Sequence, residues 1–190
     1  YSPTQYISVD EATLPFKGVS SFKVYNPKKP VKYGLKNYVA ADASNGYVLR
    51  VLPFTGKHTV TVTEGRLKTE QVVINLMEPF FGTGRVCATD SYYSSPSLFK
   101  ELMENELGAI GTVGLNRKGM PVQLRTTPLS KSNRGPVFYK QEKILAMSWY
   151  DVKRVNMIST ISDCTVRERQ VLRTFRKDLV DLMLLFDLSF

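Results

Sequence analysis

Alternating apolar and polar residues predict β-strands over the first third of the chain. An apolar side chain returns at about every second position in three separate runs, which is the period of a half-buried strand. The Ser-Asn-Gly sequence at 44–46 is a tight-turn signal, so the second and third runs are expected to pair antiparallel. Pro27 and Pro30 argue against a central strand in the stretch between the first two runs. The three expected strands span residues 5–11, 35–43 and 47–54.

The hydrophobic period then changes, and helices are expected to alternate with strands. Apolar residues recur at helical spacing over 67–78, and a short apolar strand follows at 86–89. Ser95 is a favoured N-cap residue and Pro96 is favoured at the first helical position, so a second helix is expected to begin there. A further strand is expected at 109–114.

The second half of the chain is expected to contain more strands than helices. Residues 116–134 are basic and turn-rich and indicate a loop. A hairpin is expected within 137–150 and one more strand at 155–160, and the charged stretch at 166–179 could form a helix. The whole pattern predicts an α/β fold in which helices flank a mixed sheet.

This order of elements is the one used by ribonuclease-H-like nucleotidyl transferases, and it suggests a division of the chain. Residues 5–114 are expected to form the ribonuclease-H-like core, with the first five strands and two helices. Residues 115–163 are expected to form a β-rich insertion with the late strands. Residues 164–190 are interpreted as a degenerate or truncated C-terminal segment, and the first residue, Tyr1, indicates a fragment of a longer chain.

The charge of the chain favours a polyanionic partner. Its 26 Lys and Arg residues outnumber its 17 Asp and Glu residues, for a net charge of +9. Such an excess is typical of proteins that bind nucleic acid or, less often, an acidic membrane, and a basic protein without such a partner is the alternative. No secretory signal is recognised, and the apolar run at 179–190 is too short to span a bilayer. No membrane partner is therefore expected.

Carboxylates, rather than thiols or imidazoles, are the candidate metal ligands. Cys87 and Cys164 form no CxxC pair and His58 is the single histidine, so no zinc site is expected. Asp10 and Asp90 each come near the end of an expected strand. If those strands are neighbours, the carboxylates lie side by side, and a cation such as Mg²⁺ or Mn²⁺ would relieve their repulsion. Two unrelated turn or cap aspartates are the alternative.

Six motifs in sequence order resemble the transposase domain of the piggyBac family of DNA transposases and their derived cellular proteins. Each motif alone is weak, but together they extend over about residues 6–163. Asp42 also lies where that family often has an acid at the end of a strand. The motifs are Ser-Val-Asp-Glu at 8–11 with Pro-Phe-Lys-Gly at 15–18, the basic segment 25–36, Thr-Asp-Ser-Tyr-Tyr-Ser-Ser at 89–95, Gly-Thr-Val at 111–113 with Asn-Arg-Lys at 116–118, Trp-Tyr-Asp-Val-Lys at 149–153, and Ile-Ser-Thr-Ile-Ser-Asp at 158–163.

The resemblance implies which carboxylates would be catalytic and bind metal. By position, Asp10 and Asp90 correspond to the first two metal-binding aspartates of the family. The third follows a Gly-Gly-Val-Asp motif in the family, and the nearest sequence here is Val-Asp-Leu-Met at 180–183, which makes Asp181 the candidate. The motif is incomplete, because Lys-Asp-Leu at 177–179 replaces the glycine pair. The cysteine-rich zinc module of the family is also missing from this sequence.

The resemblance also implies an activity, namely cut-and-paste DNA transposition into TTAA targets by two-metal phosphoryl transfer with Mg²⁺ or Mn²⁺. The implied partner is double-stranded DNA, at the transposon ends and at the target, and the implied location is the nucleus. A homodimer is one alternative for the oligomeric state. A domesticated or decayed derivative that binds DNA without catalysis is the second interpretation, because the third acid lies in a damaged motif. An unrelated metal-dependent nuclease is the third.

Basic residues are predicted to contact the DNA backbone. Lys and Arg side chains neutralise phosphates and position a duplex without reading its sequence. Tyr92 and Tyr93 follow the second acid, and one of them is expected to pack in the core. The candidate phosphate-binding residues are Lys17, Lys28, Lys29, Lys32, Lys36, Arg117 and Lys118.

Overall fold

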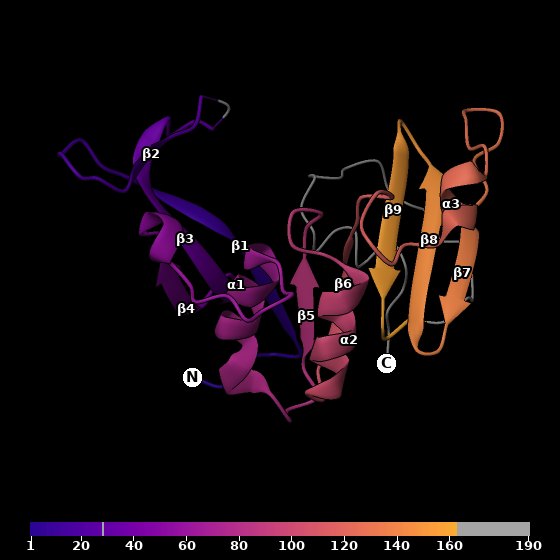
Figure 1. Ribbon diagram of the computed structural model, residues 1–190, viewed down its shortest axis with the longest axis horizontal. Helices are drawn as coiled ribbons and strands as arrows, with labels where there is room; N and C mark the ends of the chain where they lie inside the picture. Colours follow the sequence, from indigo (N-terminus) through magenta and orange to yellow (C-terminus); the bar gives the residue numbers. More distant parts are fainter. Residues whose placement is uncertain (28, 163–190) are drawn as a thin grey trace.

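The computed structural model describes residues 1–27 and 29–162, whose strands form one mixed sheet with helices packed against it (Figure 1). Lys28 and residues 163–190 lie outside the described residues, as do the expected helix at 166–179 and Asp181. The helices are α1 (Lys68–Met77), α2 (Pro96–Glu104) and α3 (Val122–Thr126), with 3₁₀ turns at Gly56–His58 and Glu78–Phe80. The strands are β1 (Tyr6–Pro15), β2 (Lys23–Tyr25), β3 (Tyr33–Asp42), β4 (Val48–Pro53), β5 (Val86–Thr89), β6 (Gly108–Thr112), β7 (Val137–Gln141), β8 (Ile144–Tyr150) and β9 (Arg154–Ser159).

The first long strand of the chain lies inside the sheet. β1 pairs antiparallel with β3 on one side and parallel with β5 on the other. β5 continues in parallel to β6, and the antiparallel strands β9, β8 and β7 follow in that order. β2 and β4 both pair with β3. The expected α/β fold, with a mixed sheet flanked by helices, is therefore confirmed, and β1 and β5 are neighbours.

One face of the sheet is covered by α1 and α2 (Figure 1). The side chains of Ile7 and Val9 on β1 and of Cys87 on β5 are buried on this face. They belong to one apolar cluster with Val73 of α1 and Phe99 of α2. Because alternate side chains of a strand point to opposite faces, the odd-numbered residues of β1 lie on the helix side.

The opposite face of the sheet has an apolar cluster of its own. Tyr6 of β1 packs against this second cluster, as expected for an even-numbered position. Alternation therefore places Asp10 on this second face and Glu11 on the helix face. The buried members of this second apolar cluster are Val86, Ala88, Ile110, Leu145, Met147 and Met157.

β1 is longer than its hydrophobic pattern predicted. The expected strand ended at residue 11, whereas pairing with β3 continues to Pro15, opposite Gly34. The prediction that Asp10 comes near the end of its strand is therefore wrong, because Asp10 lies in mid-strand. β5 pairs with β1 only as far as Val9, so the part of β1 beyond Asp10 is largely exposed. The alternation of apolar and polar residues therefore fades there.

Two short elements escaped the sequence pattern. β2 is a three-residue strand, and α3 is a five-residue helix within the stretch expected to be a loop. Neither is long enough to show a hydrophobic period. α3 is held by a residue distant in sequence, since Arg154 of β9 donates hydrogen bonds to the carbonyl oxygens of Leu124 and Thr127.

The start of α2 agrees with its predicted cap. The Ser95 hydroxyl accepts a hydrogen bond from the Leu98 N–H at 3.1 Å, and Pro96 is the first helical residue. The buried Glu70 carboxylate of α1 accepts hydrogen bonds from the hydroxyls of Ser95 and Ser97 at 2.5 and 2.6 Å. Burial would raise the pKa of Glu70, but these hydrogen bonds hold that pKa below its ordinary value. Glu70 therefore fixes the start of α2 to α1.

The late strands extend the same sheet as the core strands. β6 pairs with β9, with Gly111 opposite Ile158, so residues on both sides of the expected boundary at 114 contribute to one sheet. The expected division into a core and a β-rich insertion stays a prediction. None of the described helices is long and apolar enough to cross a membrane.

Candidate active site

Asp10 of β1 and Asp90, the residue directly after β5, are neighbours where the two parallel strands lie side by side. Val9 of β1 lies opposite Thr89 of β5, and each aspartate is the next residue of its chain segment. Asp10 is exposed and Asp90 is half-buried. The predicted placement on adjacent parallel strands is confirmed, whereas metal binding by this pair stays a prediction.

The charges of this pair favour a cation. Burial raises the pKa of the Asp90 carboxyl; the Tyr92 N–H, 2.9 Å from Asp90 Oδ1, acts against that rise, and the charges of Asp10 and Glu11 add to it. A divalent cation would relieve this repulsion, and carboxylate oxygens are suitable ligands for Mg²⁺ or Mn²⁺. The two aspartates therefore fit such an ion. Within residues 1–27 and 29–162, no group of three or more His, Cys, Asp or Glu side chains could hold a metal.

The turn after β5 fixes the backbone of Asp90. The Asp90 carbonyl oxygen accepts hydrogen bonds from the N–H groups of Tyr93 and Ser94 at 3.2 and 3.0 Å and from the Ser94 hydroxyl at 2.8 Å. The hydroxyls of Ser94 and Thr89 also share a hydrogen bond of 2.8 Å. Gly111 of β6 leaves room for this turn, because a Cβ there would lie 2.2 Å from the Thr89 carbonyl oxygen and 2.5 Å from Ser94 Oγ.

Lys36 forms an ion pair with Glu11, the residue that follows Asp10. Its Nζ lies 2.8 Å from Glu11 Oε1, and both side chains are largely buried. The same ammonium lies 4.8 Å from the ring centroid of Tyr38 and 5.5 Å from that of Tyr92. Burial alone would lower the pKa of Lys36, but the hydrogen bond and charge of Glu11 raise it above its ordinary value. Lys36 was predicted to contact a DNA phosphate, and the structure places it in an internal ion pair.

Arg117 also hydrogen-bonds to the backbone of the protein itself. Its Nη2 donates hydrogen bonds to the carbonyl oxygens of Ser91 and Tyr92 at 3.0 and 2.5 Å. These two residues follow Asp90 directly, so Arg117 contacts the turn that carries the second acid. Its neighbour Lys118 is exposed.

The other predicted phosphate contacts lie on a separate part of the molecule. Lys17 and Lys32 are exposed and Lys29 is half-buried. The loops on either side of β2, which contain these lysines, project beyond the sheet (Figure 1). Here the term basic arm denotes these loops, residues 16–32. Their contact with DNA stays a prediction, and Lys28 lies outside the described residues.

Asp42, the acid that the resemblance places at the end of a strand, is the last residue of β3. Its carboxylate is buried and accepts hydrogen bonds from the N–H and hydroxyl groups of Thr4 and Ser44 and from the Tyr1 hydroxyl. Burial would raise the pKa of Asp42, but these hydrogen bonds hold it well below its usual range. Asp42 therefore anchors the N-terminal segment to the turn after β3.

Sequence reasoning gave no role at this site to Glu11 or Tyr93, although both lie near the aspartate pair. Tyr93 is fully buried, as was expected for one of the two tyrosines, while Tyr92 is 46% exposed. Burial and the charge of Glu11 raise the pKa of Tyr93. Glu11 lies opposite Tyr38 in the pairing of β1 with β3, a neighbour that the local sequence does not reveal.

A family model described as Transposase IS4 matches residues 1–181. The chain belongs to this family. It is a piggyBac-like transposase, as its six motifs predicted. A cryo-EM structure described as a piggyBac transposase synaptic complex with hairpin DNA is similar to this chain, with a TM-score of 0.76 and 29% sequence identity. The match covers 88% of this chain and 36% of that one, so this transposase chain spans little more than a third of the length of its solved relative.

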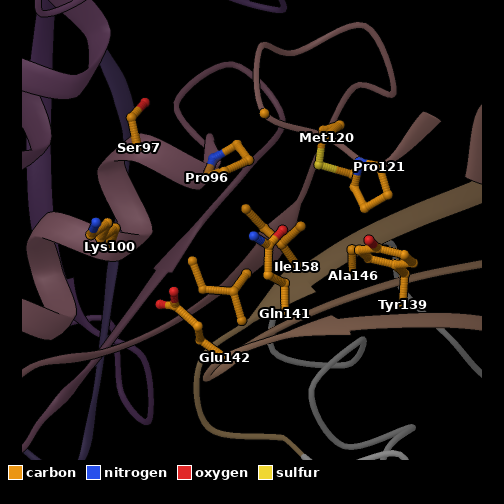
Figure 2. Close-up of a pocket in the computed structure, with 12 residues that line it drawn as sticks. Pro96, Ser97, Lys100, Met120, Pro121, Tyr139, Gln141, Glu142, Ala146 and Ile158 are labelled. Atoms are coloured by element: carbon orange, nitrogen blue, oxygen red, sulfur yellow. The ribbon is translucent and has the colours of Figure 1, made fainter.

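The transposase chain has a pocket of about 260 Å³ away from the aspartate pair. Figure 2 shows it between the first turns of α2 and the β7–β8 hairpin. Met120, Pro121 and Ile158 give it apolar walls, and Lys100 and Glu142 lie at its polar side. No residue of the candidate metal site lines this pocket among the described residues.

Proposed function

We propose that this chain is the catalytic domain of a DNA transposase that acts by metal-dependent phosphoryl transfer. The observation that carries the proposal is the position of Asp10 on β1 beside Asp90, which directly follows the parallel strand β5. Their mutual repulsion, the net charge of +9 and membership of a transposase family support it.

The residues divide the work between metal binding and DNA binding. Asp10 and Asp90 would hold a divalent ion, Mg²⁺ or Mn²⁺, through their carboxylate oxygens. Such an ion, when bound, neutralises charge that builds on the phosphoryl oxygens and activates the attacking oxygen. The basic arm would bind the phosphate backbone and bring the scissile bond to the aspartate pair.

The activity of the complete protein is part of this proposal. The solved relative was determined with hairpin DNA, and we infer that this chain acts on double-stranded DNA at transposon ends and targets. Cut-and-paste transposition into TTAA sites, in the nucleus and by a homodimer, is the corresponding full function. This chain covers 36% of the relative, so the complete reaction is proposed for the longer protein.

A DNA-binding derivative without catalysis is the second candidate. It is favoured by the sequence around Asp181, where Lys-Asp-Leu at 177–179 replaces the glycine pair of the family motif. With only two carboxylates, one ion of a two-metal site would lack a protein ligand. We therefore expect the 190-residue chain to bind Mn²⁺ weakly and to leave transposon-end DNA uncut.

Mn²⁺ titration followed by electron paramagnetic resonance tests the metal site. Asp10→Asn and Asp90→Asn should each abolish binding, because each removes one of two charged ligands. Asp151→Asn is the matched control, since this aspartate is exposed in the turn between β8 and β9. Equal Mn²⁺ affinity in the wild type and both site variants would refute the proposal.

A nicking assay on duplex DNA containing the transposon end distinguishes the two candidates. Absence of Mn²⁺-dependent nicking, with retained DNA binding, supports the non-catalytic derivative. Nicking that disappears in both Asp10→Asn and Asp181→Asn would place Asp181 in the active site and establish the enzyme.

A further inference from the structure

We propose that Lys36 and Arg117 are positioning residues that hold the Asp90 turn in place for metal binding. The inference rests on the proposed function, because it requires Asp10 and Asp90 to bind a divalent ion. It assigns to both basic residues a role different from the phosphate contacts predicted from the sequence.

Arg117 acts on Asp90 through the peptide groups that follow it. Its Nη2 donates to the carbonyl oxygens of Ser91 and Tyr92. The Tyr92 N–H in turn donates to Asp90 Oδ1 at 2.9 Å. A shift of the turn would therefore move the hydrogen bond that orients the carboxylate. Partners of this kind behind a metal ligand commonly tune its affinity.

Lys36 connects both acid-bearing segments from the helix face. Its ammonium forms an ion pair with Glu11, the residue after Asp10. It also lies 5.5 Å from the centre of the Tyr92 ring, within the range of a cation–π interaction. One cation thus contacts β1 beside the first acid and the turn that carries the second.

Burial argues against a phosphate contact for Lys36. The side chain of Lys36 is 23% exposed and that of Glu11 is 20% exposed. Lys36 would have to leave a partly buried carboxylate in order to reach DNA, and an unpaired buried charge is costly. Lys17 and Lys32 on the basic arm are exposed and face no such cost.

The direction of a change in Mn²⁺ affinity tests the inference. A nearby Lys or Arg cation repels Mn²⁺, so loss of its charge alone would tighten Mn²⁺ binding. Loss of positioning would weaken it. We expect Lys36→Met and Arg117→Met each to raise the Mn²⁺ dissociation constant about tenfold, the lower end of the range for such partners. Lys100→Met removes the same charge from an exposed position of α2 and should change the constant less than twofold.

Conservative variants separate positioning from loss of folding. Lys36→Arg keeps a cation that can pair with Glu11 and lie over the Tyr92 ring, and it should restore affinity to within about threefold of the wild type. Tyr92 is exposed, so its variants should fold. Tyr92→Phe keeps the ring and should bind Mn²⁺ like the wild type, whereas Tyr92→Leu should bind more weakly. Circular dichroism without metal checks that each variant is folded.

Four outcomes decide between the inference and the proposed function. Weaker binding in Lys36→Met, Arg117→Met and Tyr92→Leu, with rescue by Lys36→Arg and Tyr92→Phe, supports the inference. Unchanged or tighter binding in the folded variants overturns it and leaves the proposed function intact. If Lys36→Met and Arg117→Met fail to fold, equal affinity of Tyr92→Leu and Tyr92→Phe overturns it. If the wild type binds no Mn²⁺, the proposed metal site fails and the inference with it.

Discussion

At the scale of single residues, the buried carboxylate of Asp42 sets a pH dependence of stability. Its pKa is held below the ordinary value in the folded chain, so the ionised form stabilises the fold fully only above about pH 5. The stabilisation is lost progressively as the pH falls further, because the unfolded chain takes up the proton first. We expect Asp42→Asn to lower the free energy of unfolding by about 2 kcal/mol at pH 7 and to flatten its decline in acid.

Urea unfolding at pH 7, 5 and 3.5 measures this effect. Asp151→Asn serves as the control, because Asp151 is exposed and its loss should matter by less than about 0.5 kcal/mol at any of these pH values. An acid decline equally steep in Asp42→Asn and in the wild type would contradict the prediction.

Single residues also show what sequence patterns can and cannot predict. Asp10 and Asp90 were found because an apolar run precedes each of them and the strand order brings the runs together. The ion pair of Lys36 with Glu11 was not found, because pairing in a sheet joins residues 25 positions apart and no local pattern encodes it. The inward contacts of Arg117 were hidden for the same reason.

At the scale of elements, the close approach of β6 to β5 depends on Gly111. A Cβ at this position would meet the Thr89 carbonyl oxygen and Ser94 Oγ at 2.2 and 2.5 Å. We expect Gly111→Ala to force the strands apart and to destabilise the fold by about 2 kcal/mol, which corresponds to a fall in Tm of roughly 4–8 °C. Because the displaced turn carries Asp90, Mn²⁺ binding should weaken as well. Differential scanning calorimetry measures the first effect.

Gly114→Ala is the matched control for this substitution. An added Cβ there meets no heavy atom within 4 Å, so the Tm should change by no more than about 2 °C. Equal Tm values for the two variants would show that strand spacing tolerates a side chain at Gly111.

The short helix α3 depends on one distant side chain. Arg154 donates to the carbonyl oxygens of Leu124, within α3, and of Thr127, just after it. We expect Arg154→Met to destabilise the fold by about 2 kcal/mol, because hydrogen bonds from a charged donor to partly buried carbonyl oxygens are lost. The backbone amides of α3 should then exchange with solvent more readily. Hydrogen–deuterium exchange should show faster exchange at 122–127 than in the wild type, and unchanged protection there would contradict this role.

Element lengths explain why part of the fold was predictable. α1 and α2 have full hydrophobic periods, and α2 also has a serine cap, so their positions followed from local signals. β2, α3 and the outer half of β1 lack such signals, because β3 or Arg154 stabilises them from elsewhere in the sequence. Residues 166–179 lie outside the described residues, and the helix expected there stays a prediction.

At the scale of the whole molecule, the net charge of +9 and the basic arm predict a salt-dependent affinity for DNA. We plot the logarithm of the DNA association constant against the logarithm of the salt concentration. The triple substitution of Lys28, Lys29 and Lys32 by Ala should make this negative slope less steep by about 3. A triple substitution of Lys100, Lys140 and Lys143, all exposed, removes the same charge from other surfaces and should change the slope by less than 1. Fluorescence anisotropy at several salt concentrations measures both, and equal slopes would refute a specific role for the arm.

The parallel pairing of β1 with β5 has a consequence for biosynthesis. Residues 16–85 separate the two strands, and at roughly 5–20 residues per second a ribosome needs about 4–14 s to translate them. During that time β3 and β4 can pair on one side of β1, while the other side remains an open edge. An unpaired edge invites association between nascent chains, and a charge on such a strand opposes it. We therefore expect Asp10 to protect the growing polypeptide from aggregation before its partner strand has left the ribosome.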